Sequence, residues 1–314
     1  MCRRIHIARS SRGTYESQHS IFLLWCEAFG ADPLSLSSDQ LSDCVVHFAM
    51  GHTVTSVASY LSALQNFYDC HGAGKLPRSA DFHLVVKGLR RLLGAADVVV
   101  RTKALSMDDL FLLVSSLDPA DPDDCCFVAE LIVAFFLFLR TEDHVAGRLR
   151  WRDIYPQVDG SVELVLPPGK SCKVHRNVAI VAREDVLDAR LWLERLAAHL
   201  PSERRVGDFP VFVSFARTRG GSCNYWAVSR GHFVGRFKRG VKEVLGFDPQ
   251  MYAGYSLRRG GVTEVLSAPK PPPMPAVKHV AGWVPDSTAF NKYFDSTGHK
   301  QLRLPSAALL PQRK

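Results

Sequence analysis

The sequence predicts a mainly α-helical protein with a small β-sheet, organised as two domains. Helical apolar periodicity fills most of the first 94 residues, and a second helical region contains two short strand patterns. At 314 residues the chain is long enough for two domains. Apolar residues make up 46% of it and charged residues 22%, which is typical of a globular protein with an ample core.

The first domain is predicted to be a four-helix bundle over residues 13–94, after a basic tail over residues 1–12. The fourth helical pattern, "DFHLVVKGLRRLLG", is expected to begin at an Asp81 N-cap. Its predicted apolar face consists of Phe82, Val85, Val86, Leu89, Leu92 and Leu93. Its basic face consists of Lys87, Arg90 and Arg91. These three cations either favour a helix C-terminus or are candidate DNA contacts.

A linker is predicted over residues 95–105, because "AADVVVRTKAL" shows no helical period. The second domain, over residues 106–314, should open with a helix capped by Ser106. Asp109 stands three residues on, which completes a capping-box pattern, and Leu105 and Leu110 are spaced for a hydrophobic staple.

The centre of the second domain is predicted to be a buried helix, since Cys125–Leu139 is apolar except for Glu130 and too short to span a bilayer. The acidic loop at 117–124 is expected to favour the start of that helix rather than to bind a metal. Two strand patterns follow, at 161–167 and 175–181, joined by "PGKSCK". The GKS in this turn is no nucleotide-binding loop, which needs a glycine where Leu164 stands.

The charge distribution favours an anionic partner, nucleic acid before a membrane surface. The formal net charge is +8 and the pI about 9.1. Residues 204–242 contain nine lysines and arginines against one acid, Asp208. A helical apolar stripe in this segment leaves Arg236, Lys238 and Arg239 largely outside it, so these three are further candidate DNA contacts.

Cysteine usage and the N-terminus predict an intracellular protein, nuclear in a eukaryotic host and otherwise in the cytoplasm or nucleoid. The eight cysteines show no CxxC and no zinc-finger spacing, so reduced thiols are expected. The start "MCRRIHIARSSR" lacks the apolar stretch of a signal peptide, and we expect no membrane partner.

Five dispersed residues could together carry out phosphoryl transfer without a metal or other cofactor: Arg140, Lys170, Arg258, Trp283 and Tyr293. Attack on a phosphodiester gathers negative charge on its equatorial oxygens, and guanidinium groups match those oxygens bidentately. A lysine can protonate the leaving oxygen while a tyrosine attacks and holds the strand covalently. Each residue alone is more often structural.

The motifs around these residues resemble the tyrosine recombinase (phage integrase) superfamily. "LRTED", "GKSCK", "YSLRRGG", "AGW" and "NKYF" follow one another in that family's order, and "TSVASYLSAL" and "VVKGLRRLLG" resemble its core-binding domain. The resemblance extends over about residues 13–296. "KGLRR", "LRRGG" and "GW…KYF" are similar to the Crypton and DIRS branch of eukaryotic mobile elements.

The resemblance implies a role for each residue. Arg140 is the first catalytic arginine with Asp143 as its neighbouring acid, and Arg258 is the second arginine. Lys170 is the hairpin lysine, with Lys173 as the fallback. Trp283 takes a position that is often histidine, Tyr255 stands where histidine is usual, and Arg259 is a supporting residue. Tyr293 is the nucleophile that forms a 3′-phosphotyrosyl bond. The competing Tyr225, Tyr252, His144, His175, His232 and His279 rank lower.

The resemblance also implies a helical SAM-like core-binding domain and an α+β catalytic domain that together clamp duplex DNA. The implied activity is site-specific cutting and rejoining of DNA for mobile-element integration or excision, without metal or ATP. Four protomers would act on two sites. Two alternatives stay open: a DNA-binding protein that no longer cuts, which Tyr255 favours, and a monomeric type IB topoisomerase.

Overall fold

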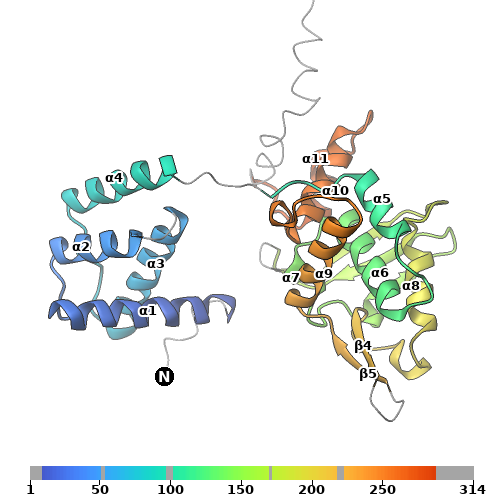
Figure 1. The fold of residues 1–314 in the computed structure, drawn as a ribbon, viewed down its shortest axis with the longest axis horizontal. Helices are drawn as coiled ribbons and strands as arrows, with labels where there is room; N and C mark the ends of the chain where they lie inside the picture. The colour runs from blue at the N-terminus through green and yellow to red at the C-terminus, as the bar shows by residue number, and fades with distance from the viewer. Residues whose placement is uncertain (1–8, 51–53, 97–101, 170–171, 218–222, 288–314) are drawn as a thin grey trace, which may run out of the picture. The chain divides into compact units, whose positions relative to one another are not determined.

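The computed structural model describes residues 9–50, 54–96, 102–169, 172–217 and 223–287 (Figure 1). The chain divides into two compact units, Met1–Val100 and Arg101–Lys314. The division falls within the segment that the sequence assigns to a linker. The mainly α-helical class with small antiparallel sheets is confirmed.

The first unit consists of four helices around one apolar core. They are α1 (Arg9–Phe29), α2 (Ser38–Ala49), α3 (Val54–His71) and α4 (Ala80–Ala96). The core contains Val57, Leu61, Leu64 and Tyr68 of α3. Helix α1 begins at Arg9, inside the segment expected to be a tail, and α4 continues to Ala96, inside the expected linker.

Two details of α4 differ from the prediction. The N-cap is Ser79 rather than Asp81, since the Ser79 hydroxyl accepts a hydrogen bond from the Phe82 N–H at 3.1 Å. Leu92 is 72% exposed. Phe82, Val86, Leu89 and Leu93 already complete a stripe at helical spacing against the core, and Leu92 lies beyond its edge.

The second unit contains helices, a three-stranded sheet and a two-stranded ribbon. Its helices are α5 (Met107–Ser115), α6 (Pro122–Phe136), α7 (Thr141–His144), α8 (Ala189–Ala198), α9 (Arg230–Glu243), α10 (Tyr255–Ser267) and α11 (Met274–Ala281). Its strands are β1 (Ile154–Pro156), β2 (Val162–Leu166), β3 (Arg176–Ile180), β4 (Val213–Arg217) and β5 (Cys223–Ala227).

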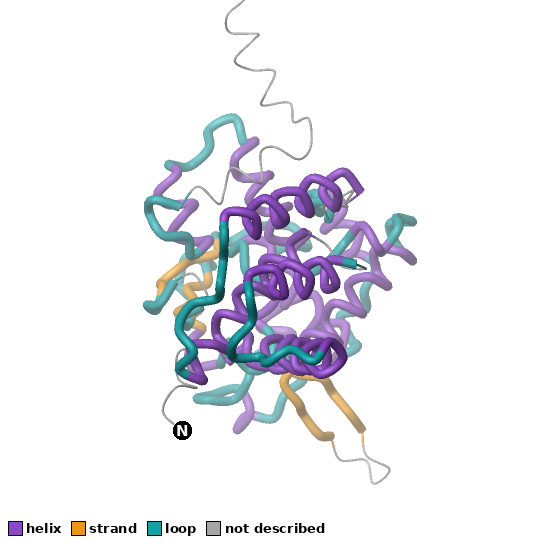
Figure 2. The backbone as a smooth tube through the Cα atoms, turned by 90° about the vertical axis from the view of Figure 1, so that its left-hand side faces the viewer, coloured by secondary structure: helices purple, strands orange, loops and turns teal. Residues whose placement is uncertain are grey.

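Both predicted strands exist, but three others were not predicted. The sheet order β1-β2-β3 is antiparallel throughout, with Leu166 opposite Arg176 where the hairpin opens. Strands β4 and β5 form a separate antiparallel ribbon that extends from the helices of this unit (Figure 2). The sequence of β5 lacks the apolar alternation by which a strand is recognised, and none of its residues is fully buried.

Helix α6 forms the centre of this unit, as expected from its apolar sequence. Every residue from Cys125 to Phe135 is buried, and Asp121 caps the helix by accepting a hydrogen bond from the Asp124 N–H. The predicted capping box at Ser106 is confirmed, with both of its hydrogen bonds to Asp109 present. Leu105 and Leu110 are fully buried in the same core cluster.

Two glycines set how closely α10 approaches its neighbours. A Cβ atom at Gly260 would lie 1.8 Å from the Leu105 carbonyl oxygen, and one at Gly261 would lie 2.1 Å from the Phe135 carbonyl oxygen. No side chain fits at either position. This close backbone approach brings α10 against the end of α6.

Candidate active site

The site is built around the short turn that joins α6 to α7. The chain reverses at Phe138, which has φ 51°, and α7 begins immediately after Arg140. The Arg140 N–H donates to the Asp143 carboxylate at 3.0 Å, and the Asp143 N–H donates to the Arg140 carbonyl at 2.8 Å. These two hydrogen bonds fix the backbone from which the Arg140 side chain extends.

Asp143 orients this turn, whereas Glu142 does not. The Glu142 carboxylate forms an exposed ion pair with Arg230 at 3.0 Å. The Asp143 side chain is buried and lies against the hairpin between β2 and β3. A Cβ atom at Gly169 would be only 2.9 Å from the Asp143 carboxylate, so a side chain there would shift this carboxylate. The strand-joining hairpin therefore meets the arginine turn at this carboxylate.

The start of α10 meets the same turn from another side. A Cβ atom at Gly254 would lie 2.0 Å from the Thr141 hydroxyl. This contact brings the half-exposed Tyr255 next to Arg140. Both residues line an open cavity of about 560 Å³ whose wall also contains Lys238 and the ion pair between Arg230 and Glu142. An anionic ligand of phosphodiester size fits the charge and dimensions of this cavity.

Arg258 is not among the residues that line this cavity. Its side chain is fully buried, and its guanidinium donates to the Phe138 carbonyl and, at 2.9 Å, to the Ala281 carbonyl. The guanidinium also lies over the Trp283 ring, 4.8 Å from its centroid. Direct contact between Arg258 and a phosphate therefore requires a rearrangement that exposes the guanidinium.

Trp283 is buried and follows directly on the end of α11. It packs with Phe138, Val262 and Val277 in a small apolar cluster. With Lys173, it also lines an apolar groove of about 700 Å³. Lys173, the fallback lysine, is exposed, and its ammonium lies 3.5 Å from the Gly169 carbonyl oxygen. Lys170 and Tyr293 lie outside the described residues.

Arg259 supports the site from behind. Its guanidinium donates to the Thr102 carbonyl, and the Leu105 N–H donates to the Ser256 carbonyl at 3.1 Å. These hydrogen bonds hold the chain segment before α5 against α10. The contact is structural, as expected for a companion to the second arginine.

A third arginine of the site, Arg176, was not identified from the sequence. It begins β3, is 5% exposed, and donates to the His279 and Val280 carbonyls at the end of α11. Burial lowers the pKa of Arg176, Asp143 opposes this shift, and the nearby Arg258 and Arg140 act in the same direction as burial. Arg140, Arg258 and the Asp143 carboxylate thus all lie close enough to Arg176 to affect its pKa.

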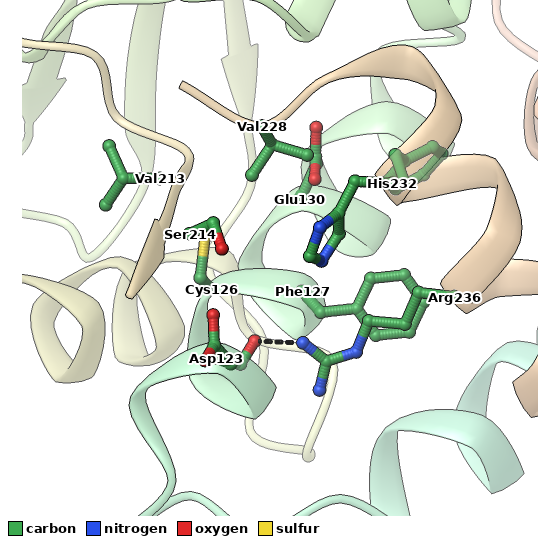
Figure 3. Close-up of a pocket in the computed structure, with 10 residues that line it drawn as sticks. Asp123, Cys126, Phe127, Glu130, Val213, Ser214, Val228, His232 and Arg236 are labelled. Carbon is green, nitrogen blue, oxygen red and sulfur yellow. Dashed lines mark hydrogen bonds between the residues drawn. The ribbon is translucent and has the colours of Figure 1, made fainter. Parts of the chain in front are cut away.

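The candidate DNA contacts divide into exposed and internal groups. Lys87, Arg90, Arg91 and Arg239 are exposed, and Lys238 lines the cavity. Arg236 differs, because it binds Asp124 and the Asp123 carbonyl and covers the Phe127 ring (Figure 3). Its role is to pack α9 onto α6, and the expectation that it contacts DNA is not supported.

A buried acid–base pair lies close to Arg236. The Glu130 carboxylate is 2.7 Å from His144 Nδ1, and both side chains are 1% exposed. Burial raises the pKa of Glu130, against the lowering effect of His144, His232 and Arg236. Figure 3 shows His232 near Glu130 in the same small pocket. The pair joins α6 to α7 and so supports the turn at Arg140 from within the core.

Three of the competing residues, Tyr225, Tyr252 and His279, are in contact with neighbouring side chains or backbone. Tyr252 is buried, which raises its pKa, and it stacks on Phe247. Burial also raises the pKa of Tyr225 in the β4–β5 ribbon. His279 lies 3.2 Å from the Asn177 carbonyl oxygen and packs α11 on β3.

Solved structures with the same fold are DNA recombination proteins. A lambda integrase dimer bound to a core site matches with a TM-score of 0.62 and 17% identity over 95% of this chain and 75% of that one. The Tn1549 transposon integrase in complex with circular intermediate DNA matches with a TM-score of 0.64 and 12% identity, over 98% of this chain and 95% of that one. The XerH site-specific recombinase bound to a palindromic difH substrate matches with a TM-score of 0.63 and 16% identity, over 94% of this chain and 78% of that one.

The fold is therefore that of the tyrosine recombinases and integrases, as the motifs predicted. The resemblance to the Crypton and DIRS branch stays a prediction. No family model and no curated protein matches the sequence. Within the described part of the chain, no helix is long and apolar enough to cross a membrane.

Proposed function

We propose that this protein is a tyrosine recombinase that cuts and rejoins duplex DNA through a covalent 3′-phosphotyrosyl intermediate. The observation that carries the proposal is the proximity of Arg140, Arg176, Arg258 and the Asp143 carboxylate, beside an open cavity whose wall contains Arg140, Arg230 and Lys238 with one acid, Glu142. Clustered arginines are suited to bind an anion. The shared fold with DNA-bound recombinases supports a DNA phosphate as this anion.

In the proposed reaction, Arg140 contacts the scissile phosphate from the cavity wall. Arg258, which does not line the cavity, adds positive charge to the site. It exchanges a carbonyl contact for a phosphate oxygen when DNA enters. Both guanidinium groups stabilise the charge that develops on the equatorial oxygens during attack. The Trp283 ring holds the Arg258 guanidinium by stacking, and the Tyr255 hydroxyl donates a hydrogen bond where an imidazole is usual.

Tyr293 is the proposed nucleophile. Its phenolate oxygen bonds to phosphorus as the bond from phosphorus to the 5′ oxygen breaks, and Lys170, or Lys173 in its place, gives that oxygen a proton. The phosphotyrosyl bond keeps the energy of the broken diester, so rejoining by a 5′-hydroxyl needs neither ATP nor a metal. The phenol has an ordinary pKa of about 10, and the surrounding cations favour its ionised form.

The proposed partner is a specific duplex site contacted by both units. Lys87, Arg90 and Arg91 on α4 and Lys238 and Arg239 on α9 are the proposed backbone contacts. One of the solved structures of similar fold is a lambda integrase tetramer bound to a Holliday junction. We propose a corresponding assembly of four protomers here, acting in the integration or excision of a mobile element.

Covalent capture tests the activity. The protein is incubated with fragmented DNA from its source genome and denatured in detergent, and the DNA that stays attached is sequenced. We expect enrichment of one inverted-repeat site with the wild type and none with Tyr293→Phe. Recovery of equal amounts of attached DNA from both proteins would exclude Tyr293 as the nucleophile.

A second function is favoured by two observations at the site. Tyr255 replaces a residue that usually accepts a proton, and Arg258 is bonded to its own protein's carbonyls. A DNA-binding protein that no longer cuts fits both. It would retain specific binding to the inverted-repeat site and give no attached DNA. Relaxation of supercoils without a specific site would instead indicate a type IB topoisomerase.

A further inference from the structure

The C-terminal end of α11 is closed by an unusual combination of donors. Gly282 adopts φ 64°, its N–H donates to the His279 carbonyl, and the Trp283 N–H donates to the Lys278 carbonyl. This is the Schellman arrangement, which satisfies two of the last four carbonyls of a helix. The carbonyls of Val280 and Ala281 lie beyond the reach of these two donors and need others.

Two buried arginines supply the missing donors. The Arg176 guanidinium donates to the Val280 carbonyl and, at 3.2 Å, to the His279 carbonyl. The Arg258 guanidinium donates to the Ala281 carbonyl at 2.9 Å. Positive charge at this end also complements the helix dipole. The segment that leads into Trp283 is therefore held by one arginine from α10 and one from β3.

Gly282 and Asn177 strengthen the link between β3 and α11. A Cβ atom at Gly282 would lie 2.8–3.1 Å from the guanidinium atoms of Arg176, so a side chain there would displace the arginine. The Asn177 carbonyl is also 3.2 Å from His279 Nε2. The glycine of "AGW" thus allows the left-handed turn and also leaves space for the Arg176 guanidinium.

The burial of Arg176 between β3 and α11 costs free energy, and a purely stabilising role does not explain that cost. Arg176 is 5% exposed, and its Nε atom has no hydrogen-bond partner among the described residues. Burying a guanidinium with an unsatisfied N–H is unfavourable, and an apolar residue would pack the same space more cheaply. An energetically unfavourable buried residue beside reactive groups is expected where the positions of those groups matter more than the stability of the fold.

We propose that Arg176 is a positioning residue of the active site. It joins the strand that follows the Lys170 hairpin to the end of α11, and so fixes the Trp283 ring under the Arg258 guanidinium. The inference rests on the proposed function for its chemical meaning. Its structural part, that Arg176 determines where Trp283 lies, can be tested without any activity.

Fluorine NMR of protein labelled with 5-fluorotryptophan tests that structural part. The protein has five tryptophans, and Trp283→Phe identifies the resonance of interest. We expect Arg176→Lys, which keeps the charge but loses the planar fork, to shift or broaden the Trp283 resonance. Arg190→Lys is the matched control, because Arg190 also donates to a backbone carbonyl, that of Gln157, beyond the other end of the sheet.

An unchanged Trp283 resonance in Arg176→Lys, together with a lower melting temperature, would overturn the proposal and leave Arg176 a merely stabilising residue. Arg176→Gln, an uncharged donor, is measured in parallel in case the lysine variant does not fold. Unfolding of both variants, with Arg190→Lys folded, would also overturn it, because Arg176 would then be needed for the whole unit.

Covalent capture of DNA tests the catalytic consequence. Misplacement of a reacting group by about 1 Å lowers rates roughly 100-fold, so attached DNA should form about 100-fold more slowly with Arg176→Lys. The rate with Arg190→Lys should equal that of the wild type. Equal rates for Arg176→Lys and wild type would contradict the positioning role. If the wild type itself attaches no DNA, the proposed function fails, while the Trp283 resonance still decides the role of Arg176.

Discussion

Backbone carbonyls are the ligands of the buried arginines in this site. Arg258 donates to the carbonyls of Phe138 and Ala281, Arg176 to those of His279 and Val280, and Arg259 to that of Thr102. A carbonyl oxygen satisfies a guanidinium N–H but carries no net charge. These contacts therefore position the cations through bonds to neutral groups.

The buried Glu130 gives the protein a distinctive dependence of stability on pH. Because burial raises its pKa, the folded state keeps this proton at pH values where the unfolded state has released it. The free energy of unfolding should therefore fall as pH rises from the unfolded pKa, about 4.3, to the higher folded pKa. Glu130→Gln keeps an oxygen for His144 but cannot ionise, so we expect this fall to be absent.

Urea unfolding at a series of pH values measures this effect. Glu163→Gln is the control, since Glu163 is an exposed carboxylate on β2 and should leave the wild-type profile unchanged. A Glu130→Gln profile that falls with pH as steeply as the wild type would show that other groups cause the dependence.

At the scale of elements, the packing of α10 depends on its two glycines. Gly260→Ala places a methyl group against the Leu105 carbonyl, where backbone rather than a flexible side chain must move. We expect the free energy of unfolding to fall by about 3 kcal/mol, the upper end of the usual range for overpacking. Gly235→Ala in α9 meets open space and should raise it by about 0.5–1 kcal/mol.

Denaturant unfolding of both variants separates steric conflict from helix propensity. The substitution is the same in each, so intrinsic propensity alone predicts stabilisation in both. A stabilised Gly260→Ala variant would mean that α10 and the segment before α5 do not pack as described.

Elements with a strong local signal could be predicted from the sequence, and those defined by distant contacts could not. The apolar run of α6, the Ser106 capping box and the β2–β3 hairpin each depend on neighbouring residues. Arg140, Arg258 and Trp283 could be proposed from the sequence because each lies in a short motif. Arg176 was missed, because one arginine in a strand pattern gives no sign of partners 103 residues away.

On the scale of the whole molecule, candidate DNA contacts occur in both units. Lys87, Arg90 and Arg91 form an exposed basic face of α4, and Lys238 and Arg239 belong to α9. If both units bind one duplex, each set should contribute separately to the salt dependence of binding. If only the second unit binds, the α4 cations should be without effect.

Salt titrations of duplex binding distinguish these cases. The slope of log K against log salt concentration changes by about 0.9 for each phosphate that the protein no longer neutralises. Substituting all three α4 cations with glutamine should therefore make the slope less steep, and substituting Lys238 and Arg239 should do so independently. Lys75→Gln and Lys270→Gln are the controls, because each removes one exposed cation from its unit outside the proposed DNA-binding sets. An α4 variant with the wild-type slope would restrict DNA binding to the second unit, whereas additive changes in slope from the two sets require that both units bind the same DNA.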